Sequence, residues 1–347
     1  MKIRQLAFAV PGNLDSKTGG YIYDRRLMEE LRGQGREVQH IELGSSFPDP
    51  SAEHLADAMA QLSGVPKAQA LIVDGLALGA MDPAIVSDIS ASLVALIHHP
   101  LAYENGIDEK RQQLLFETEK VNLSYAKKVI VPSPNTKSLL VSEYEVPESK
   151  ITIARPGVDR KNIASKPQGP ALILSVGIQV PRKGHDVLLQ ALAKIADLEW
   201  QAVLVGGVLD SEYGISLVDL RERLGLTSRV VLAGELDSEE VAELYARATV
   251  FALATRHEGY GMVFDEAMSF GLPIVSCDVG AVSQTIASGA GILTEVDNPE
   301  AFADALRSVL LDNELRNQMV ASSQLAAQTL GSWGETAKIV ASVLDSL

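Results

Sequence analysis

Short apolar runs alternate with longer segments that carry apolar residues on one helical face. Continuous apolar runs predict buried strands, and apolar residues spaced three or four apart predict amphipathic helices. Strands alternating with helices indicate parallel sheets with crossover helices, an α/β fold. In the first half the predicted strands are 6–10, 38–43, 70–74, 92–98 and 128–131, and the predicted helices are 21–34, 108–127 and 136–143.

The alternation stops at a stretch rich in turn-forming residues and then resumes. Pro and Gly within 154–159 and 165–170 discourage a continuing helix or strand. We therefore predict two Rossmann-like domains, 1–163 and 164–330, followed by a C-terminal helix, 331–347, that packs back on the first domain. In the second domain the predicted strands are 171–176, 201–205, 230–233, 250–253 and 273–277, and the helices are 185–195, 216–224, 238–246, 262–270 and 299–311.

Composition narrows the class of protein. The 347 residues are 46% hydrophobic and 22% charged, which is ordinary for globular domains. No apolar run approaches the roughly 20 residues of a membrane helix, and the first apolar run is too short for a signal peptide. A cytoplasmic protein is therefore expected. The net charge of −15 argues against a nucleic-acid partner and leaves at most peripheral membrane contact. Cys277, the single cysteine, excludes an internal disulfide and a cysteine metal cluster.

A basic turn follows the predicted strand 171–176. Ligands of open parallel sheets bind outside the carboxyl ends of the strands, so Arg182 and Lys183 stand where a phosphate would lie. Gly177 and Gly184 would let the backbone approach such a ligand. Arg can grip phosphate oxygens with two hydrogen bonds, and Lys acts as a compact charge. The alternative is an exposed basic turn without a ligand.

A second loop, after the predicted strand 250–253, carries Glu258 and leads into a helix that carries Glu266. Gly259 and Gly261 leave backbone N–H groups uncrowded, and the N-terminus of a helix favours an anion. Carboxylates accept hydrogen bonds from hydroxyls, so this pair suits a sugar and a ribose. The alternative is a helix-capping acid with a solvated Glu.

A third candidate is the segment 96–106, which carries His98 and His99 at the end of a predicted strand. A histidine there can contact a sugar and orient a hydroxyl, although an isolated histidine is often structural. Tyr103 and Glu104 could line the same pocket, and Glu104 could instead cap a helix. Two adjacent histidines are not a metal site without further ligands.

The order and spacing of these motifs resemble the family 4 retaining glycosyltransferases of the GT-B fold. The resemblance covers nearly the whole chain and rests on residues 19–20, His98, 155–159, 181–184 and 258–273. It implies two Rossmann-like domains with parallel sheets that face each other across a cleft. The first domain would bind the acceptor, and the second would bind a nucleotide sugar.

The resemblance also implies residue roles. Glu258 would bind hydroxyls of the transferred sugar, and Glu266 would hold the ribose. Arg182 and Lys183 would neutralise the diphosphate that leaves. A loop containing Gly19 and Gly20 would close over the phosphate. The catalytic candidates are Glu258, His98, Arg182 and Lys183; the donor-binding candidates are Gly19, Gly20, Gly177, Arg182, Lys183, Glu258, Gly259, Tyr260, Gly261, Met262, Val263 and Glu266; the acceptor-side candidates are His98, His99, Tyr103 and Glu104.

The implied activity is a retaining hexosyltransferase. It would move a sugar from a UDP- or GDP-sugar to a hydroxyl of a saccharide or glycolipid, with no cofactor and no metal. One departure from the family is Ile178, where an Arg often follows the glycine of the phosphate strand; Arg256 is a hypothetical substitute for that contact. The alternatives are another GT-B activity, such as a nucleotide-sugar epimerase or a phosphorylase, and a catalytically silent nucleotide-sugar-binding protein.

Overall fold

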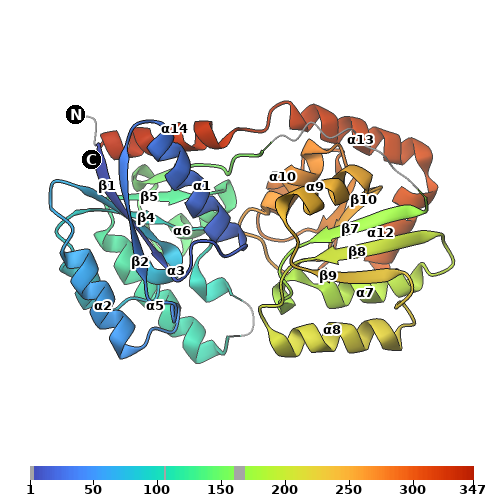
Figure 1. Cartoon of the computed structure of the whole chain (residues 1–347), viewed down its shortest axis with the longest axis horizontal. Coiled ribbons are helices and arrows are strands. Elements are labelled where there is room, and N and C mark those ends of the chain that lie inside the picture. Colours follow the sequence, from blue (N-terminus) through green and yellow to red (C-terminus); the bar gives the residue numbers. More distant parts are fainter. Residues whose placement is uncertain (1–3, 105–106, 160–168) are drawn as a thin grey trace. The chain divides into compact units, whose positions relative to one another are not determined.

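The computed structural model describes residues 4–104, 107–159 and 169–347. These residues form two compact units (Figure 1). The first consists of Met1–Gly157 and Gly331–Leu347, and the second is Val158–Leu330. The boundary predicted at 163/164 lies outside the described residues.

The first unit is built on a parallel six-stranded sheet in the order β2-β1-β3-β4-β5-β6. Strands β2 and β3 lie on opposite sides of β1, so the crossover direction reverses between β1 and β3. In open α/β sheets this switch point is where ligands bind. The strands are β1 (Gln5–Pro11), β2 (Glu37–Leu43), β3 (Ala70–Asp74), β4 (Ser92–Leu96), β5 (Lys128–Val131) and β6 (Ile151–Ile153).

Helices cover both faces of this sheet (Figure 1). One face, with Ala7, Leu71 and Val129, packs in a core that includes residues of α2, α5 and α6. On the other side α1 and α14 pack against each other. The helices are α1 (Gly19–Gly33), α2 (Ala52–Ser63), α3 (Gly75–Leu78), α4 (Pro83–Ser87), α5 (Glu109–Tyr125), α6 (Pro134–Ser142) and α14 (Trp333–Asp345), with 3-10 turns η1 (Leu101–Tyr103) and η2 (Glu148–Lys150).

The second unit has a parallel sheet in the order β12-β11-β10-β7-β8-β9, so its switch point lies between β7 and β10. Alternate residues of the strands face two cores, because successive strand residues point to opposite faces. One core joins the sheet to α7, α8 and α12, and the other joins it to α9 and α10. The strands are β7 (Ala171–Val176), β8 (Trp200–Val205), β9 (Val230–Gly234), β10 (Val250–Leu253), β11 (Ile274–Cys277) and β12 (Gly291–Thr294). The helices are η3 (Pro181–Lys183), α7 (His185–Lys194), α8 (Ser211–Arg223), α9 (Ser238–Arg247), α10 (Met262–Ser269), α11 (Val282–Thr285), α12 (Pro299–Leu311) and α13 (Asn313–Ala327).

The predicted α/β class with parallel sheets is confirmed. Two boundaries differ in ways that matter for function. Helix α1 begins at Gly19, so Gly19 and Gly20 form its first turn and not the preceding loop. Strand β4 ends at Leu96, which places His98 in the loop that follows. The elements α2, α3, α4, α11, β6 and β12 were not predicted from the sequence.

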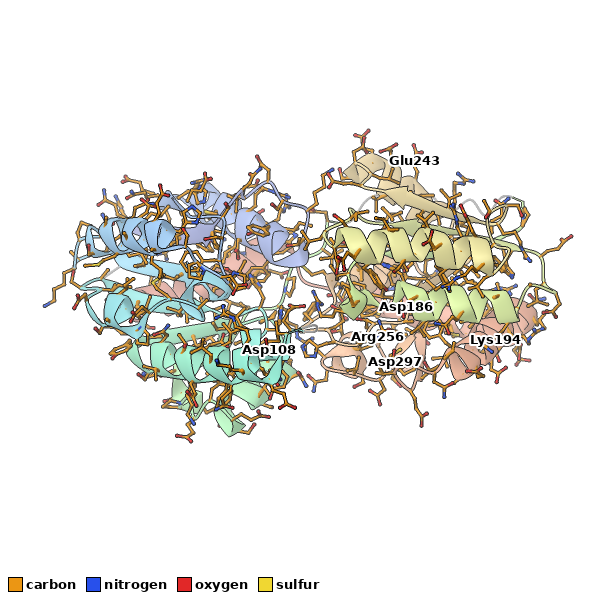
Figure 2. All side chains as sticks on the ribbon, turned by 90° about the horizontal axis from the view of Figure 1, so that it is seen from below. Asp108, Asp186, Lys194, Glu243, Arg256 and Asp297 are labelled. Carbon is orange, nitrogen blue, oxygen red and sulfur yellow. The ribbon has the colours of Figure 1, made fainter. Side chains whose placement is uncertain are left out.

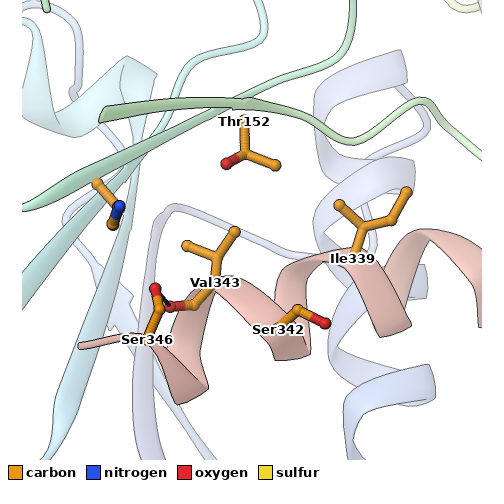
Figure 3. A pocket seen from close by; sticks show the side chains of 6 residues that line it. Thr152, Ile339, Ser342, Val343 and Ser346 are labelled. Atoms are coloured by element: carbon orange, nitrogen blue, oxygen red, sulfur yellow. Dashed lines mark hydrogen bonds between the residues drawn. The ribbon is translucent and has the colours of Figure 1, made fainter. Parts of the chain in front are cut away.

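The C-terminal helix α14 is anchored by its first residue. Trp333 is buried and packs edge-on against Tyr23 of α1, with ring centroids 5.5 Å apart. A pocket beside α14 is lined by Ile339, Ser342, Val343 and Ser346, together with Thr152 (Figure 3) and Lys128. Because Lys128 begins β5, this pocket lies away from the carboxyl ends of the strands. Among the helices of the described residues, none is both long and apolar enough to cross a membrane.

Candidate functional site

The loops that follow β7 and β10 lie side by side at the switch point of the second unit, and their backbones are in direct contact. The Arg256 N–H donates to the Arg182 carbonyl at 2.8 Å. Gly184 has φ +62°, and a Cβ at this position would lie 1.9 Å from the Ala254 carbonyl oxygen. Only glycine suits both the left-handed conformation and this close approach. The two motifs that the sequence separates by about seventy residues are therefore one structural unit.

Lys183 and Glu258 form an ion pair across these two loops. The Lys183 Nζ lies 2.6 Å from Glu258 Oε1, and their side chains are only 12% and 6% exposed. The Thr255 hydroxyl donates to the same carboxylate oxygen at 3.1 Å. Burial alone would raise the pKa of Glu258, but the charge of Lys183, then that of Arg182, and these hydrogen bonds hold it below its ordinary value. Glu258 is therefore a carboxylate at neutral pH.

Helix α10 begins directly after this pair. Gly261, at φ +86°, is its N-cap and offers no side chain to bond the first N–H groups. The helix therefore presents amides and the positive end of its dipole beside Glu258, as an anion requires. Farther along the helix, Glu266 Oε2 accepts a hydrogen bond from the Tyr245 hydroxyl at 3.0 Å. Tyr260, Met262 and Val263 lie at this same turn.

The remaining phosphate-side candidates also lie at this edge of the sheet. The Arg182 guanidinium donates to the His257 carbonyl at 3.3 Å, which connects it to the Glu258 loop. The Gly177 N–H donates to the Val205 carbonyl at 2.8 Å and extends the sheet by one position past β7. Ile178 follows it and is partly exposed. Arg182 and Lys183 are therefore the basic side chains that the loop after β7 places near the proposed phosphate position.

Arg256 is held by acidic neighbours, which argues against the hypothesis that it replaces the missing phosphate contact. Its guanidinium bonds both carboxylate oxygens of Asp186, at 3.0 and 2.8 Å, and Asp297 at 2.7 Å. A further bond reaches the Pro181 carbonyl. Figure 2 shows Asp186, Arg256 and Asp297 close together at the start of α7. Four of its donor contacts are thus used inside the protein, and Arg256 braces the two loops.

Arg256→Ala should therefore destabilise the loops more than it weakens a ligand. Loss of charged hydrogen bonds costs about 2 kcal/mol, so we expect a lower thermal midpoint and a less than about threefold change in nucleoside diphosphate affinity. The control is Arg307→Ala, which removes a more exposed bidentate pair with Asp197 in the same unit and should lower the thermal midpoint less, because solvent screens exposed ion pairs. Calorimetric titration and thermal unfolding measure both effects. A tenfold or greater loss of affinity in Arg256→Ala would restore the phosphate role.

At the switch point of the first unit, His98 faces two carboxylates. Its Nε2 lies 3.0 Å from Asp24 Oδ1 and 3.4 Å from Asp74 Oδ2. Asp74 ends β3 and Asp24 is on α1, so the group joins three neighbouring connections of the sheet. Tyr23 packs edge-on against the imidazole, with centroids 5.1 Å apart. One carboxylate oxygen each of Asp24 and Asp74 and one ring nitrogen of His98 lie within 4.8 Å of one another. The short contacts in this group are those between the carboxylates and the imidazole.

Electrostatics favour a charged imidazole in this group. Burial would lower the pKa of His98, but the charge of Asp24 and hydrogen bonds with Asp24 and Asp74 raise it well above its ordinary value. Burial, and then the charge of Asp74, raise the pKa of Asp24, while His98 opposes them. These groups therefore favour the protonated imidazole, whose charge compensates buried negative charge.

The other acceptor-side candidates are paired with each other or with neighbours. His99 Nε2 lies 2.9 Å from Glu104 Oε2, so Glu104 pairs with a histidine, and Asp108 caps the following helix. The Tyr103 hydroxyl donates to Glu143. Gly20 lies against His98, where a Cβ would be 3.2 Å from the ring.

Sequence reasoning missed several residues that hold these side chains in place. Asp24 is one of the buried residues on the inner side of α1, and an acid there was an available signal. Asp74 was signalled in the sequence as well, because it is a charged residue at the carboxyl end of a parallel strand. Asp186 and Tyr245 had no signal, because their partners Arg256 and Glu266 come from other elements.

Comparisons with known proteins agree with the fold. Residues 159–325 match the family model described as glycosyl transferases group 1. The chain is 32% identical over 225 residues to a D-inositol 3-phosphate glycosyltransferase of Nocardioides sp., covering 57% of this chain and 49% of that protein. The corresponding protein of Mycolicibacterium smegmatis is 29% identical, with 61% and 51% covered. The chain spans about half the length of these curated relatives.

Solved structures match over nearly the whole chain. Sucrose-phosphate synthase from Thermosynechococcus elongatus has a TM-score of 0.82 at 20% identity, with 99% of this chain and 98% of that chain covered. Anabaena Alr3699/HepE in complex with UDP-glucose has a TM-score of 0.81 at 16% identity, with 99% and 100% covered. The predicted GT-B fold is therefore confirmed.

Proposed function

We propose that this protein is a glycosyltransferase that moves a hexosyl group from a nucleoside-diphosphate sugar to an acceptor hydroxyl. The observation that carries the proposal is the Lys183–Glu258 pair at the switch point of the second unit. The Lys183 ammonium suits a phosphate group, and the Glu258 carboxylate suits sugar hydroxyls. Both lie beside the start of α10, which has no side-chain cap. The match of residues 159–325 to glycosyl transferases group 1 supports the same activity.

In this proposal the diphosphate of a UDP- or GDP-sugar lies against Arg182, Lys183 and the first amides of α10. The bond between the anomeric carbon and the diphosphate oxygen breaks, and the nucleoside diphosphate leaves with the electron pair. The acceptor oxygen bonds to the anomeric carbon, and its proton passes to a diphosphate oxygen. This front-face route retains the anomeric configuration. Arg182 and Lys183 neutralise the charge on the leaving group, so no metal is required.

Glu258 acts on the sugar side. Its carboxylate accepts hydrogen bonds from sugar hydroxyls and lies opposite the positive charge that develops on the ring. The amides of Gly259, Gly261 and Met262 serve oxygens of the donor. Saccharides and glycolipids are the acceptor classes proposed, with His98, His99, Tyr103 and Glu104 as acceptor-side residues.

A direct test begins with donor binding. Thermal unfolding is measured with UDP, GDP and ADP and with their glucose, galactose, mannose and N-acetylglucosamine conjugates, with and without EDTA. We expect one base to stabilise the protein, with no effect of EDTA. Hydrolysis of the matching sugar nucleotide then reports turnover, and NMR of the released or transferred sugar reports anomeric configuration. Epimerised donor without acceptor would favour an epimerase, and binding without turnover would favour a silent binding protein.

Glu266→Ala tests the donor pocket separately. If Glu266 holds the ribose, its removal should weaken nucleoside diphosphate binding about tenfold, or about 1.4 kcal/mol. The control is Glu243→Ala, because Glu243 is an exposed acid on α9 in the same unit (Figure 2). Tyr245→Phe should give a smaller loss, since it removes only the bond that orients Glu266. Calorimetric titration with the nucleoside diphosphate measures each; equal affinity in Glu266→Ala and wild type would contradict the ribose contact.

A further inference from the structure

Asp24 occupies a position where an acid is costly. It is 1% exposed on α1, on the same side of the helix as Tyr23, Leu27 and Met28. A buried carboxylate is tolerated only when it is paired and hydrogen-bonded. Its polar neighbours are His98 and Asp74, both at the carboxyl ends of the neighbouring strands. The residue is therefore tied to the candidate site.

Asp74 divides its two oxygens between structure and site. Oδ1 accepts from the Leu76 N–H at 2.9 Å and caps α3. Oδ2 lies 3.4 Å from His98 Nε2. Oδ1 therefore serves the helix cap, and Oδ2 is the oxygen that interacts with the imidazole.

The histidine ring is thereby oriented. Nε2 is directed at the carboxylates, so Nδ1 points away from them. Nδ1 has no hydrogen-bond partner in the part of the chain that the structure describes, and the side chain is 20% exposed. Gly20 permits α1 to lie against the ring edge, because a Cβ there would be 3.2 Å from Cδ2.

We propose that Asp24 and Asp74 are positioning residues that keep His98 in its imidazolium form, with Nδ1–H presented as a hydrogen-bond donor to a substrate oxygen. His98 then orients a hydroxyl and does not remove the acceptor proton. This inference rests on the proposed function for the identity of the substrate, a polyhydroxylated one. It agrees with a transfer in which the acceptor proton goes to the leaving diphosphate, because the imidazolium has no vacant nitrogen to receive it.

The surrounding titratable groups do not compete for the imidazole. The Tyr21 hydroxyl donates to the Pro11 carbonyl, and the Tyr23 hydroxyl donates to the Ala154 carbonyl. The two carboxylates are thus the groups that set the charge of His98. The raised pKa of His98 agrees with this geometry.

The first readout needs no substrate. In ¹⁵N NMR spectra of the imidazole side chains, the His98 signals are assigned from their loss in His98→Gln. We expect both ring nitrogens of His98 to stay protonated from pH 6 to about pH 8.5 in the wild type. In Asp24→Asn the midpoint should fall by about 1–3 pH units, because one opposing charge is removed. A wild-type His98 that titrates near its ordinary value, or signals that shift on addition of Mg²⁺ or Zn²⁺, would overturn the inference.

The second readout is the pH profile of kcat/KM. The alkaline limb should move to lower pH in Asp24→Asn, with an added loss of about tenfold per pH unit above the new midpoint. Asp74→Asn keeps the cap of α3 and should shift the limb in the same direction. Tyr23→Phe is the control, since it keeps the ring and loses only the bond to Ala154. A uniform loss at every pH in Asp24→Asn, with unchanged His98 signals, would reduce Asp24 to a packing role. Absence of any turnover in the wild type contradicts the proposed function and leaves the NMR test intact.

Discussion

Glu258→Gln should lower sugar transfer by about 10²–10³-fold or more while the protein still folds. The substitution keeps the shape of the side chain and one acceptor oxygen, and it replaces the other oxygen by an NH2 donor. It removes the negative charge that lies opposite the positive charge developing on the sugar ring. Preorganised charges of this kind account for losses of about 10²–10³-fold when a single group is removed. Steady-state kinetics with the donor identified by thermal shift measures the loss.

Two measurements separate this effect from misfolding. Nucleoside diphosphate affinity should change little, because Arg182, Lys183 and the amides of α10 remain. Glu243→Gln, on the exposed face of α9, should leave kcat and KM unchanged. Near-normal turnover in Glu258→Gln would remove Glu258 from the mechanism.

Lys183→Met should impair both activity and stability. Methionine keeps most of the aliphatic stem but leaves Glu258 as a buried carboxylate without its ion-pair partner. Removing one member of a buried pair costs about 3–5 kcal/mol, and loss of the phosphate-side cation adds a fall in kcat/KM of about 10²-fold. Thermal unfolding and kinetics measure the two losses. The double variant Lys183→Met with Glu258→Gln should be more stable than Lys183→Met alone, because the buried charge is gone.

The pH dependence of these variants has a definite sign. In the wild type the pKa of Glu258 is lowered, so its contribution to stability is present above its unfolded-state pKa of about 4.3 and is lost as pH falls through the lower folded value. In Lys183→Met burial raises the pKa of Glu258. The stability deficit of the variant should therefore grow as pH rises from about 5 to 8. A deficit independent of pH would show that Lys183 does not control the ionisation of Glu258.

Much of the architecture could be predicted because it depends on local pattern. The strands β3, β5, β7 and β10 are mostly apolar, since both sheet faces are covered, and their predicted bounds match the structure. Very short elements were not predicted, because they contain too few residues to show a local pattern. The four-residue helix α3 and the three-residue strand β6 are too short to show a period.

Candidate residues were predicted where chemistry and position coincide along the chain. Lys183 and Glu258 each follow an apolar strand, and glycines mark the loops that carry them. The pairing between them could not be predicted, because it depends on the sheet order that sets β7 beside β10. For Arg256 the sequence position was misleading. Its place beside Glu258 suggested a contact with a ligand, but in the structure its guanidinium forms an ion pair with Asp186 of α7.

The sequence by itself determined the α/β alternation, the parallel sheets, and the loops on which the polar candidates lie, because strand and helix periods and glycine positions are local properties of the chain. Only the tertiary structure decided the ionisation of those candidates. Asp24 and Asp74 reach His98 from α1 and β3 and favour its protonated form, and Lys183 reaches Glu258 from the loop after β7 and favours its carboxylate form. Charge in a buried site depends on which groups are within a few ångströms, and the fold brings those groups together from distant parts of the chain.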